Sequence, residues 1–352
     1  MSAESYGGAE LVGLFHRQFE LCALKPGEVL VLLSDRDTDR SRVQAAFLAA
    51  EMLGADAFEV GMPRPLDRQT VNHRAPGSAP GLMQALTSAD LVCTFTPPNL
   101  SPWLAECLRA GCRVLSVTDH TNQLRRLQSP PGLKEAVLHS VDRYSKAKRV
   151  RVFTEEGTDL TFARGRPEDT EPRGYYGFAE EKGRFDQWGM GMVRDFPDEG
   201  SAHGTVVIKP GDVWILPYAR LVQSEIRLEV REGYIRSIEG GLDAKAFREW
   251  LERNKRNADD MDPFAVSHEG WGLHPNAHWD DILLHEMDFP HLMMSMRSFA
   301  GNFLFSTGPG PNRRTKGHID LTLCDCTVYL DDDMIIQRGK LVDSSMVVPA
   351  GH

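Results

Sequence analysis

The sequence lacks long apolar runs, an excess of basic residues and a secretory leader, and each absence excludes a class of protein. No apolar stretch approaches the roughly 18 residues that a membrane-spanning helix needs. Met1–Ser5 has neither the basic nor the apolar region of a signal peptide. The net charge of −10 at pH 7 argues against non-specific binding to nucleic acid or to anionic membranes. We therefore expect a cytoplasmic protein whose partners are small molecules or other copies of itself, as in a homo-oligomer.

Cysteine-based and nucleotide-binding motifs are also missing. Six cysteines in 352 residues do not make a disulfide framework, and no CxxC pair occurs. Cys324 and Cys326 share a face at strand spacing, but without a CxxC partner a packing role is preferred over a zinc site. Neither GxGxxG nor a Walker Gly-Lys-Ser is present, so no nucleotide cofactor is expected.

The first 145 residues alternate between buried strands and amphipathic helices. Apolar runs at 29–33, 57–60, 90–95 and 113–117 predict strands, separated by segments with helical periodicity. Asp39 is placed to cap a helix that runs to Leu53. This alternation predicts an N-terminal α/β domain over residues 1–145 with a mostly parallel sheet.

From residue 146 onward the pattern changes to period-two alternation. The segments 149–154 and 159–162 flank a four-residue turn and predict a hairpin, and a second long pair is expected at 224–230 and 234–238. A helix is expected over 243–254. We predict a C-terminal α/β domain over 146–352 with a mixed or antiparallel sheet. The segment 173–189, rich in glycine and aromatic residues, is expected to be a long loop.

The chemistry of the chain is indicated by His318 and Asp320, which stand two residues apart before an apolar run. Residues i and i+2 of a strand point to the same face, so both side chains can reach one metal ion. A third ligand is expected from 267–274, and His268 is proposed. Two histidines and one carboxylate with open positions suit Fe(II) oxygen chemistry. Spacing alone leaves a simple hydrogen-bonded His–Asp pair as the alternative.

Three blocks in order resemble a known family. Residues 267–273 (SHEGWGL), 301–308 (GNFLFSTG) and His318-x-Asp320, followed by 329–332 (YLDD), are similar to the 2,5-dihydroxypyridine 5,6-dioxygenases. That family resembles the thermophilic M29 metallo-aminopeptidases in fold. The resemblance covers most of the chain and implies that His268, His318 and Asp320 bind a single Fe(II).

The resemblance also implies a reaction and a substrate class. A small aromatic N-heterocycle, a hydroxylated pyridine, would be cleaved by O₂ between C5 and C6 to an N-formylmaleamate-type product. The alternative is an M29-like aminopeptidase with two metals. A two-metal site needs ions about 3.5–4 Å apart with shared carboxylates. In the aminopeptidases an acidic ligand stands where this chain has His268, so the single-iron assignment is preferred.

The resemblance places several further residues near the substrate. Arg297 and Ser306 match positions that would hold an anionic ring oxygen, and Asn302 and Gln187 are assigned to substrate binding with them. The ring hydroxyl must lose a proton, so a base is required. The candidates for this base are Glu269, His278, His274 and Tyr175, and the sequence does not distinguish among them.

Two positions depart from the pattern of the family. Relatives carry a histidine where this chain has Gln187 and a glutamate where it has Tyr175. Glutamine cannot transfer a proton near neutral pH. The reaction class is therefore predicted more firmly than the substrate, and a differently substituted hydroxypyridine or another electron-rich ring stays open.

Overall fold

The structure is a computed structural model that describes residues 8–62, 80–98, 101–165, 172–284 and 293–350. Within these ranges no helix is both long and apolar enough to cross a bilayer. The chain divides into two compact units, one within 1–129 and 176–190, the other within 130–175, 191–289 and 293–352. The contacts of the chain therefore group residues 130–145 with the second unit and residues 176–190 with the first.

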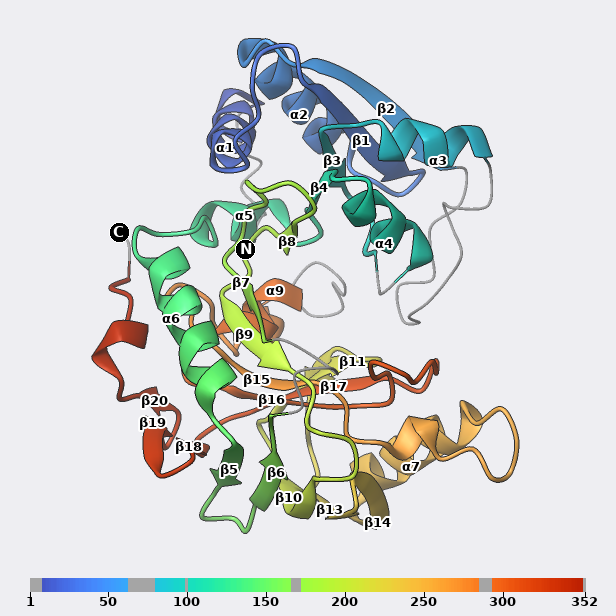
Figure 1. Cartoon of the computed structure of the whole chain (residues 1–352), viewed down its shortest axis with the longest axis vertical. Helices are drawn as coiled ribbons and strands as arrows, with labels where there is room; N and C mark the ends of the chain where they lie inside the picture. The colour runs from blue at the N-terminus through green and yellow to red at the C-terminus, as the bar shows by residue number, and fades with distance from the viewer. Residues whose placement is uncertain (1–7, 63–79, 99–100, 166–171, 285–292, 351–352) are drawn as a thin grey trace. The chain divides into compact units, whose positions relative to one another are not determined.

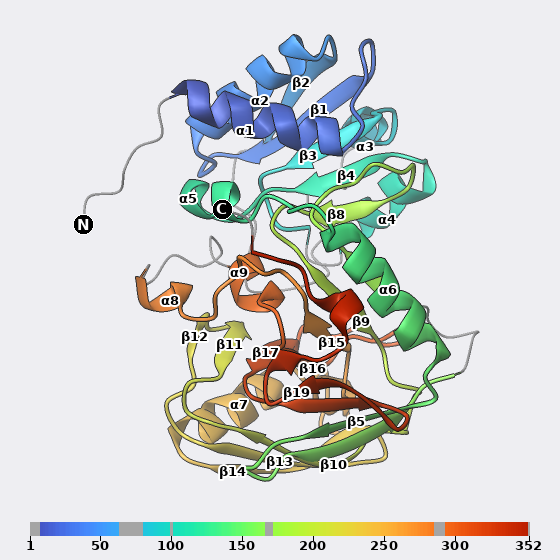
Figure 2. The same ribbon diagram turned by 90° about the vertical axis from the view of Figure 1, so that its left-hand side faces the viewer.

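The first unit is built on a five-stranded sheet in the order β2-β1-β3-β4-β8, in which every neighbouring pair is parallel. Helices α1 and α2 cover one face of this sheet, and α3 and α4 cover the other (Figures 1 and 2). The elements are α1 (Gly8–Leu21), β1 (Val29–Asp35), α2 (Arg40–Met52), β2 (Asp56–Met62), α3 (Pro80–Thr87), β3 (Leu91–Thr94), α4 (Pro102–Arg109), β4 (Arg113–Ser116), α5 (Thr121–Arg126) and β8 (Phe185–Gln187). The predicted parallel α/β architecture is confirmed.

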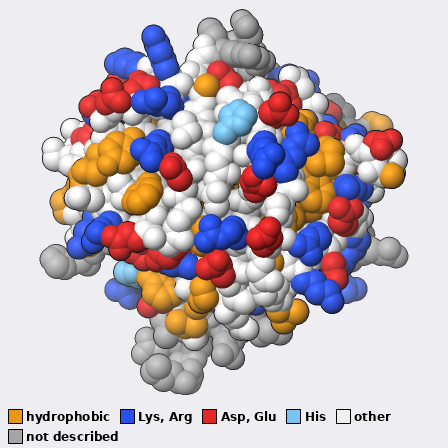
Figure 3. Space-filling view, turned by 90° about the horizontal axis from the view of Figure 1, so that it is seen from below, with side chains coloured by type: hydrophobic (Ala, Val, Ile, Leu, Met, Phe, Trp, Pro, Cys, Tyr) orange, Lys and Arg blue, Asp and Glu red, His pale blue; other side chains and the backbone are white. Residues whose placement is uncertain are grey.

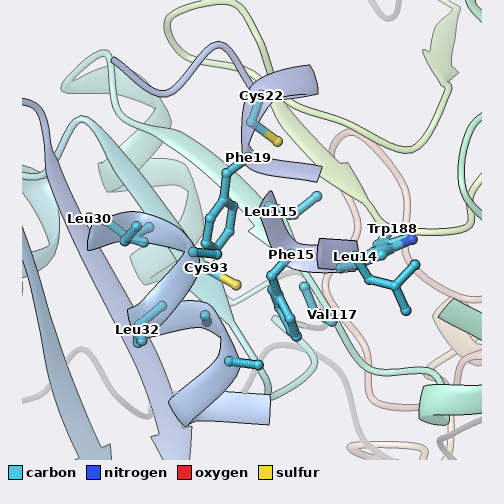
Figure 4. Packing of buried hydrophobic residues seen from close by; sticks show 14 of the residues in the cluster. Leu14, Phe15, Phe19, Cys22, Leu30, Leu32, Cys93, Leu115, Val117 and Trp188 are labelled. Atoms are coloured by element: carbon cyan, nitrogen blue, oxygen red, sulfur yellow. The ribbon is translucent and has the colours of Figure 1, made fainter. Parts of the chain in front are cut away.

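The two faces of β1 bury alternate residues against different helices. Leu30 and Leu32 belong to the core under α1 and α2, whereas Val31 and Leu33 belong to the core under α3 and α4. Figure 4 shows the first of these cores, where Phe15 meets Trp188 edge to face at 5.3 Å between ring centroids. A strand buried on both faces explains the continuous apolar run in its sequence.

The helix cap predicted at Asp39 is also confirmed. The side chain of Asp39 accepts a hydrogen bond from the Ser41 amide at 2.9 Å and so caps α2. The chain leaves this helix through Gly54, whose φ of +71° is costly for residues that carry a Cβ.

The second unit contains two antiparallel sheets, one above the other in Figures 1 and 2. The eight-stranded sheet has the order β14-β13-β10-β6-β5-β18-β19-β20, and the seven-stranded sheet the order β12-β11-β17-β16-β15-β9-β7. The strands are β5 (Arg149–Phe153), β6 (Asp159–Ala163), β7 (Arg173–Tyr175), β9 (Met192–Asp195), β10 (His203–Ile208), β11 (Val213–Leu216), β12 (Arg220–Leu221), β13 (Ile226–Arg231), β14 (Tyr234–Gly240), β15 (Glu269–Gly272), β16 (Phe303–Thr307), β17 (Ile319–Leu323), β18 (Thr327–Leu330), β19 (Asp333–Gln337) and β20 (Lys340–Leu341). The two predicted hairpins, β5–β6 and β13–β14, are confirmed.

Short helices complete the second unit. They are α6 (Leu133–Lys146), α7 (Leu242–Arg253), α8 (Asp281–Leu284) and α9 (Met293–Ser298), with 3₁₀ turns η1 (Asp262–Phe264) and η2 (Ser344–Met346). Helix α9 lies on the face of the seven-stranded sheet that is turned away from the eight-stranded sheet (Figures 1 and 2). Helix α8 begins at Asp281 and is described as far as Leu284.

The segment 173–189 differs from the long loop that was expected. Its two ends form strands that join different sheets: β7 pairs with β9, and β8 pairs with β4. Both strands are three residues long, so their pairing depends on partners distant in sequence rather than on a local pattern.

Charged residues on the outer surface are mixed in sign. On the face drawn in Figure 3, Lys and Arg side chains are interspersed with Asp and Glu. Pairs such as Arg151–Asp159, with Nε and Oδ1 2.9 Å apart, are exposed. Exposed pairs of this kind contribute little to stability.

We predict that Leu32→Ala lowers the free energy of unfolding by roughly 2–5 kcal/mol, because it leaves a cavity in a core that is closed to solvent. Leu48→Ala is the matched control, since Leu48 lies on α2 with 51% of its surface exposed. Urea unfolding of the two variants measures the difference. Equal losses of stability would contradict the assignment of Leu32 to this core.

Candidate metal centre

Asp320 and His318 lie at the centre of the seven-stranded sheet. Asp320 is in β17, between Leu216 of β11 and Ser306 of β16, so neighbouring strands support its backbone on both sides. His318 directly precedes β17, and its Nε2 lies 3.2 Å from Asp320 Oδ1. The other ring nitrogen, Nδ1, is 2.7 Å from the Thr307 carbonyl oxygen and donates to it. This bond fixes the tautomer and directs the Nε2 lone pair toward Asp320.

A β-bulge brings His268 to the same point. Val266 pairs with Thr307 and Gly270 with Leu304, so four residue steps on one strand oppose three on the other. The extra residue lies in the stretch that contains His268. Its Nε2 lies 3.3 Å from Asp320 Oδ1, and the rings of His268 and His318 are 5.3 Å apart between centroids.

The three side chains form a buried donor set. One ligand atom from each of His268, His318 and Asp320 lies within 4.8 Å of the others. Asp320 is 1% exposed, and its Oδ1 has no hydrogen-bond partner among the described residues. Two imidazole nitrogens that face one carboxylate oxygen need a cation between them. The residues therefore fit a metal ion with two nitrogen ligands and one oxygen ligand.

The electrostatics of the three side chains favour a metal ion between them over a proton on His268. Burial lowers the pKa of His268 to about 3, more than Asp320 raises it, so the ring is neutral near pH 7. Burial alone would raise the pKa of Asp320, but His318, Arg297 and His268 together hold it well below its usual value. Arg297 donates to Asp320 Oδ2, which leaves Oδ1 for the two imidazoles.

The described part of the chain contains one cluster of this kind. No other group of three or more His, Cys, Asp or Glu side chains in it is close enough to hold an ion. Cys324 and Cys326 belong to no such cluster, and burial raises the pKa of both thiols. Buried thiols with raised pKa values are poor metal ligands.

Residues assigned to substrate binding from the sequence have defined contacts around this cluster. The Asn302 amide nitrogen donates to the carbonyl oxygens of Arg297 and Phe299, at 3.0 and 2.6 Å, and so holds the end of α9. The Ser306 hydroxyl donates to the His268 carbonyl oxygen at 2.5 Å. Gln187 lies in β8 of the first unit and the cluster lies in the second, so its role in substrate binding stays a prediction.

The candidate bases occupy different surroundings. Glu269 follows His268 and is fully buried; burial, together with the charge of Asp320, raises its pKa well above the usual value. Its Oε1 accepts a hydrogen bond from the Ser306 backbone amide at 3.4 Å. His278 is exposed. His274 is buried, and its Nδ1 accepts from the Asn276 amide at 3.2 Å.

Tyr175 connects the cluster to residues that were not predicted from the sequence. Its hydroxyl accepts a hydrogen bond from Arg194 at 3.0 Å. Arg194 in turn contributes to the lowered pKa of His268, and the Phe196 ring meets the His268 ring edge to face at 5.9 Å. Arg194 and Phe196 stand two residues apart in and after β9, but no metal or substrate motif marks them.

Comparison with known proteins gives consistent results along nearly the whole chain. Residues 10–343 match the NicX family, described as 2,5-dihydroxypyridine 5,6-dioxygenase. The 2,5-dihydroxypyridine 5,6-dioxygenase of Pseudomonas putida KT2440 is 31% identical over 347 residues, covering 95% of this chain and 96% of that protein.

Solved structures agree with the sequence match. The structure of the Pseudomonas putida KT2440 2,5-dihydroxypyridine dioxygenase has a TM-score of 0.90 at 29% identity, covering 97% of this chain and 99% of that one. Wild-type AmpT from Thermus thermophilus, an M29 aminopeptidase, has a TM-score of 0.62 at 12% identity, covering 95% and 99%. The second likeness shows a shared fold, as the sequence analysis expected.

We predict that Glu269→Gln changes the pH dependence of stability. The pKa of Glu269 is raised in the folded state, so its protonated carboxyl contributes its full stabilisation at pH values below the unfolded-state pKa of about 4.3. This stabilisation is lost as the pH rises through the folded-state pKa of Glu269. The wild type should therefore lose stability relative to the neutral glutamine variant as the pH rises above the unfolded pKa of Glu269. Urea unfolding of the metal-free proteins measures this difference, and parallel pH profiles would contradict it.

Proposed function

The chain belongs to the 2,5-dihydroxypyridine 5,6-dioxygenase family, and we propose that it opens the ring of a hydroxylated pyridine with O₂ at one ferrous ion held by His268, His318 and Asp320. The observation that carries this proposal is the unpartnered, buried Asp320 Oδ1 facing two imidazole nitrogens. The C5–C6 bond breaks and both oxygen atoms enter an N-formylmaleamate-type product, so no external reductant is consumed.

Each ligand has a defined task in holding the ion. Ferrous iron held by two imidazoles and one carboxylate supplies a redox centre with open positions for O₂ and substrate. Thr307 keeps the His318 lone pair directed at the ion through its carbonyl oxygen. Arg297 occupies Asp320 Oδ2, so Asp320 would bind through Oδ1 alone. We propose that Asn302 and Ser306 act through Arg297 and His268, because their side chains donate to the backbone of those residues.

Substrate binding requires that the ring hydroxyl lose its proton. Arg297 favours the anion electrostatically, because a nearby positive charge lowers the pKa of an acid. Glu269 is a weaker candidate, because burial raises its pKa and so favours the carboxyl form that already carries a proton. His278 is exposed, whereas Tyr175 is buried beside Arg194. We therefore propose Tyr175 as a proton relay, whose hydroxyl would accept this proton as it passes its own to water, so that the side chain stays neutral. A role for Gln187 in substrate binding, and a homo-oligomeric assembly, stay predictions.

The aminopeptidase alternative has less support. A two-metal site needs further carboxylates close to the first ion, and the described residues provide a single three-residue cluster. At 12% identity, the likeness to AmpT concerns the fold alone.

We predict that anaerobically prepared, Fe(II)-loaded protein consumes one O₂ for each 2,5-dihydroxypyridine, and that His318→Ala lowers this activity at least about 10³-fold by removing an iron ligand. An oxygen electrode measures the uptake, and mass spectrometry with ¹⁸O₂ counts the atoms in the product. His203→Ala is the control, since His203 is exposed on β10. Release of amino acids from peptides, without oxygen uptake by any hydroxypyridine, would contradict the proposal.

A further inference from the structure

Arg194 is a half-buried cation whose side chain contacts aromatic residues rather than a carboxylate of the described residues. Its guanidinium donates to the Tyr175 hydroxyl at 3.0 Å and lies 5.6 Å from the ring centroids of both Tyr175 and Phe196. No carboxylate forms an ion pair with it in the described ranges. The adjacent Asp195 is not its counter-ion, because Asp195 is buried in contact with Arg164.

Arg194 lies on the same sheet face as the metal-ligand cluster. It pairs directly with Gly270 of β15, two positions after His268, and Phe196, two residues after Arg194 and on the same face, contacts the His268 ring. Gly270 has no side chain to separate Arg194 from His268. The Phe196 ring packs edge to face against His268 at 5.9 Å. These aromatic and cationic groups therefore border the ligand cluster on one side.

The charges around the cluster do not balance. Arg297 is paired with Asp320. Within the described ranges no carboxylate is paired with Arg194, and a bound divalent ion would add two more positive charges. A half-buried guanidinium in such surroundings favours a second anionic group on the ligand.

We propose that Arg194 determines specificity by pairing with a carboxylate on the pyridine ring, so that the preferred substrate is a hydroxypyridine carboxylic acid. This inference rests on the proposed ring-cleaving function and names the substrate class for it. The ring oxygen binds on the side of Asp320 and Arg297, and the carboxylate meets the guanidinium of Arg194. Tyr175 positions that guanidinium through its hydroxyl, and Phe196 provides an apolar wall beside the ring.

The test compares two substrates in the same protein. Oxygen uptake is measured with 2,5-dihydroxypyridine and with its 3- and 4-carboxylates, and the preference is the ratio of kcat/KM values. This ratio does not depend on the fraction of correctly folded enzyme. We expect the wild type to prefer one carboxylate, and Arg194→Gln to lower that preference roughly 10- to 100-fold, mainly by raising KM for the acid. Arg194→Lys should keep part of the preference, because it keeps the charge.

Arg173→Gln is the matched control, since it removes the same charge from the neighbouring strand at an exposed position. It should leave the preference within about twofold, because an exposed charge acts weakly through solvent. A wild type that cleaves 2,5-dihydroxypyridine with no preference for either acid would overturn the inference and leave the proposed function intact. Equal losses in Arg194→Gln for both substrates would also overturn it. No oxygen uptake with any of these pyridines would instead overturn the proposed function.

Discussion

The buried carboxylate of Asp320 is the constraint on which the rest of the site depends. An ionised carboxylate closed to solvent is strongly unfavourable unless charges and hydrogen bonds compensate it. Arg297 donates a hydrogen bond to Oδ2 of Asp320, while the imidazoles of His268 and His318 face Oδ1 without donating to it. A divalent ion among these three side chains would complete the compensation. The carboxylate that Arg297 and the two histidines keep ionised is therefore the group that would bind the metal.

The fold keeps this arrangement rigid. Asp320 lies on a strand flanked on both sides, so its position is set by the backbone ladder rather than by a loop. His268 reaches it through a bulge, and Asn302 holds the helix that carries Arg297. Residues far apart in the sequence meet because three neighbouring strands, β15, β16 and β17, end at one place. Donors fixed in this way need little reorganisation to bind an ion.

The sequence predicted the parts of this account that follow local rules. Strand–helix alternation gave the parallel sheet of the first unit, and period-two alternation gave the hairpins of the second. The spacing of His318 and Asp320 indicated a shared face from one strand. His268 was proposed from the stretch 267–274 and supported by the family resemblance, but the bulge that positions it cannot be read from its own residues. Arg194 and strands β7 and β8 were missed for a related reason: their roles arise from pairing with distant partners.

The most direct test of the central claim is an anaerobic titration of the metal-free protein with Fe(II), followed by calorimetry. The account predicts one equivalent bound by the wild type, and at least a tenfold weaker affinity in each of His268→Ala, His318→Ala and Asp320→Asn, since each removes a ligand. Binding of two equivalents, or unchanged affinity in the Asp320→Asn protein, would contradict it.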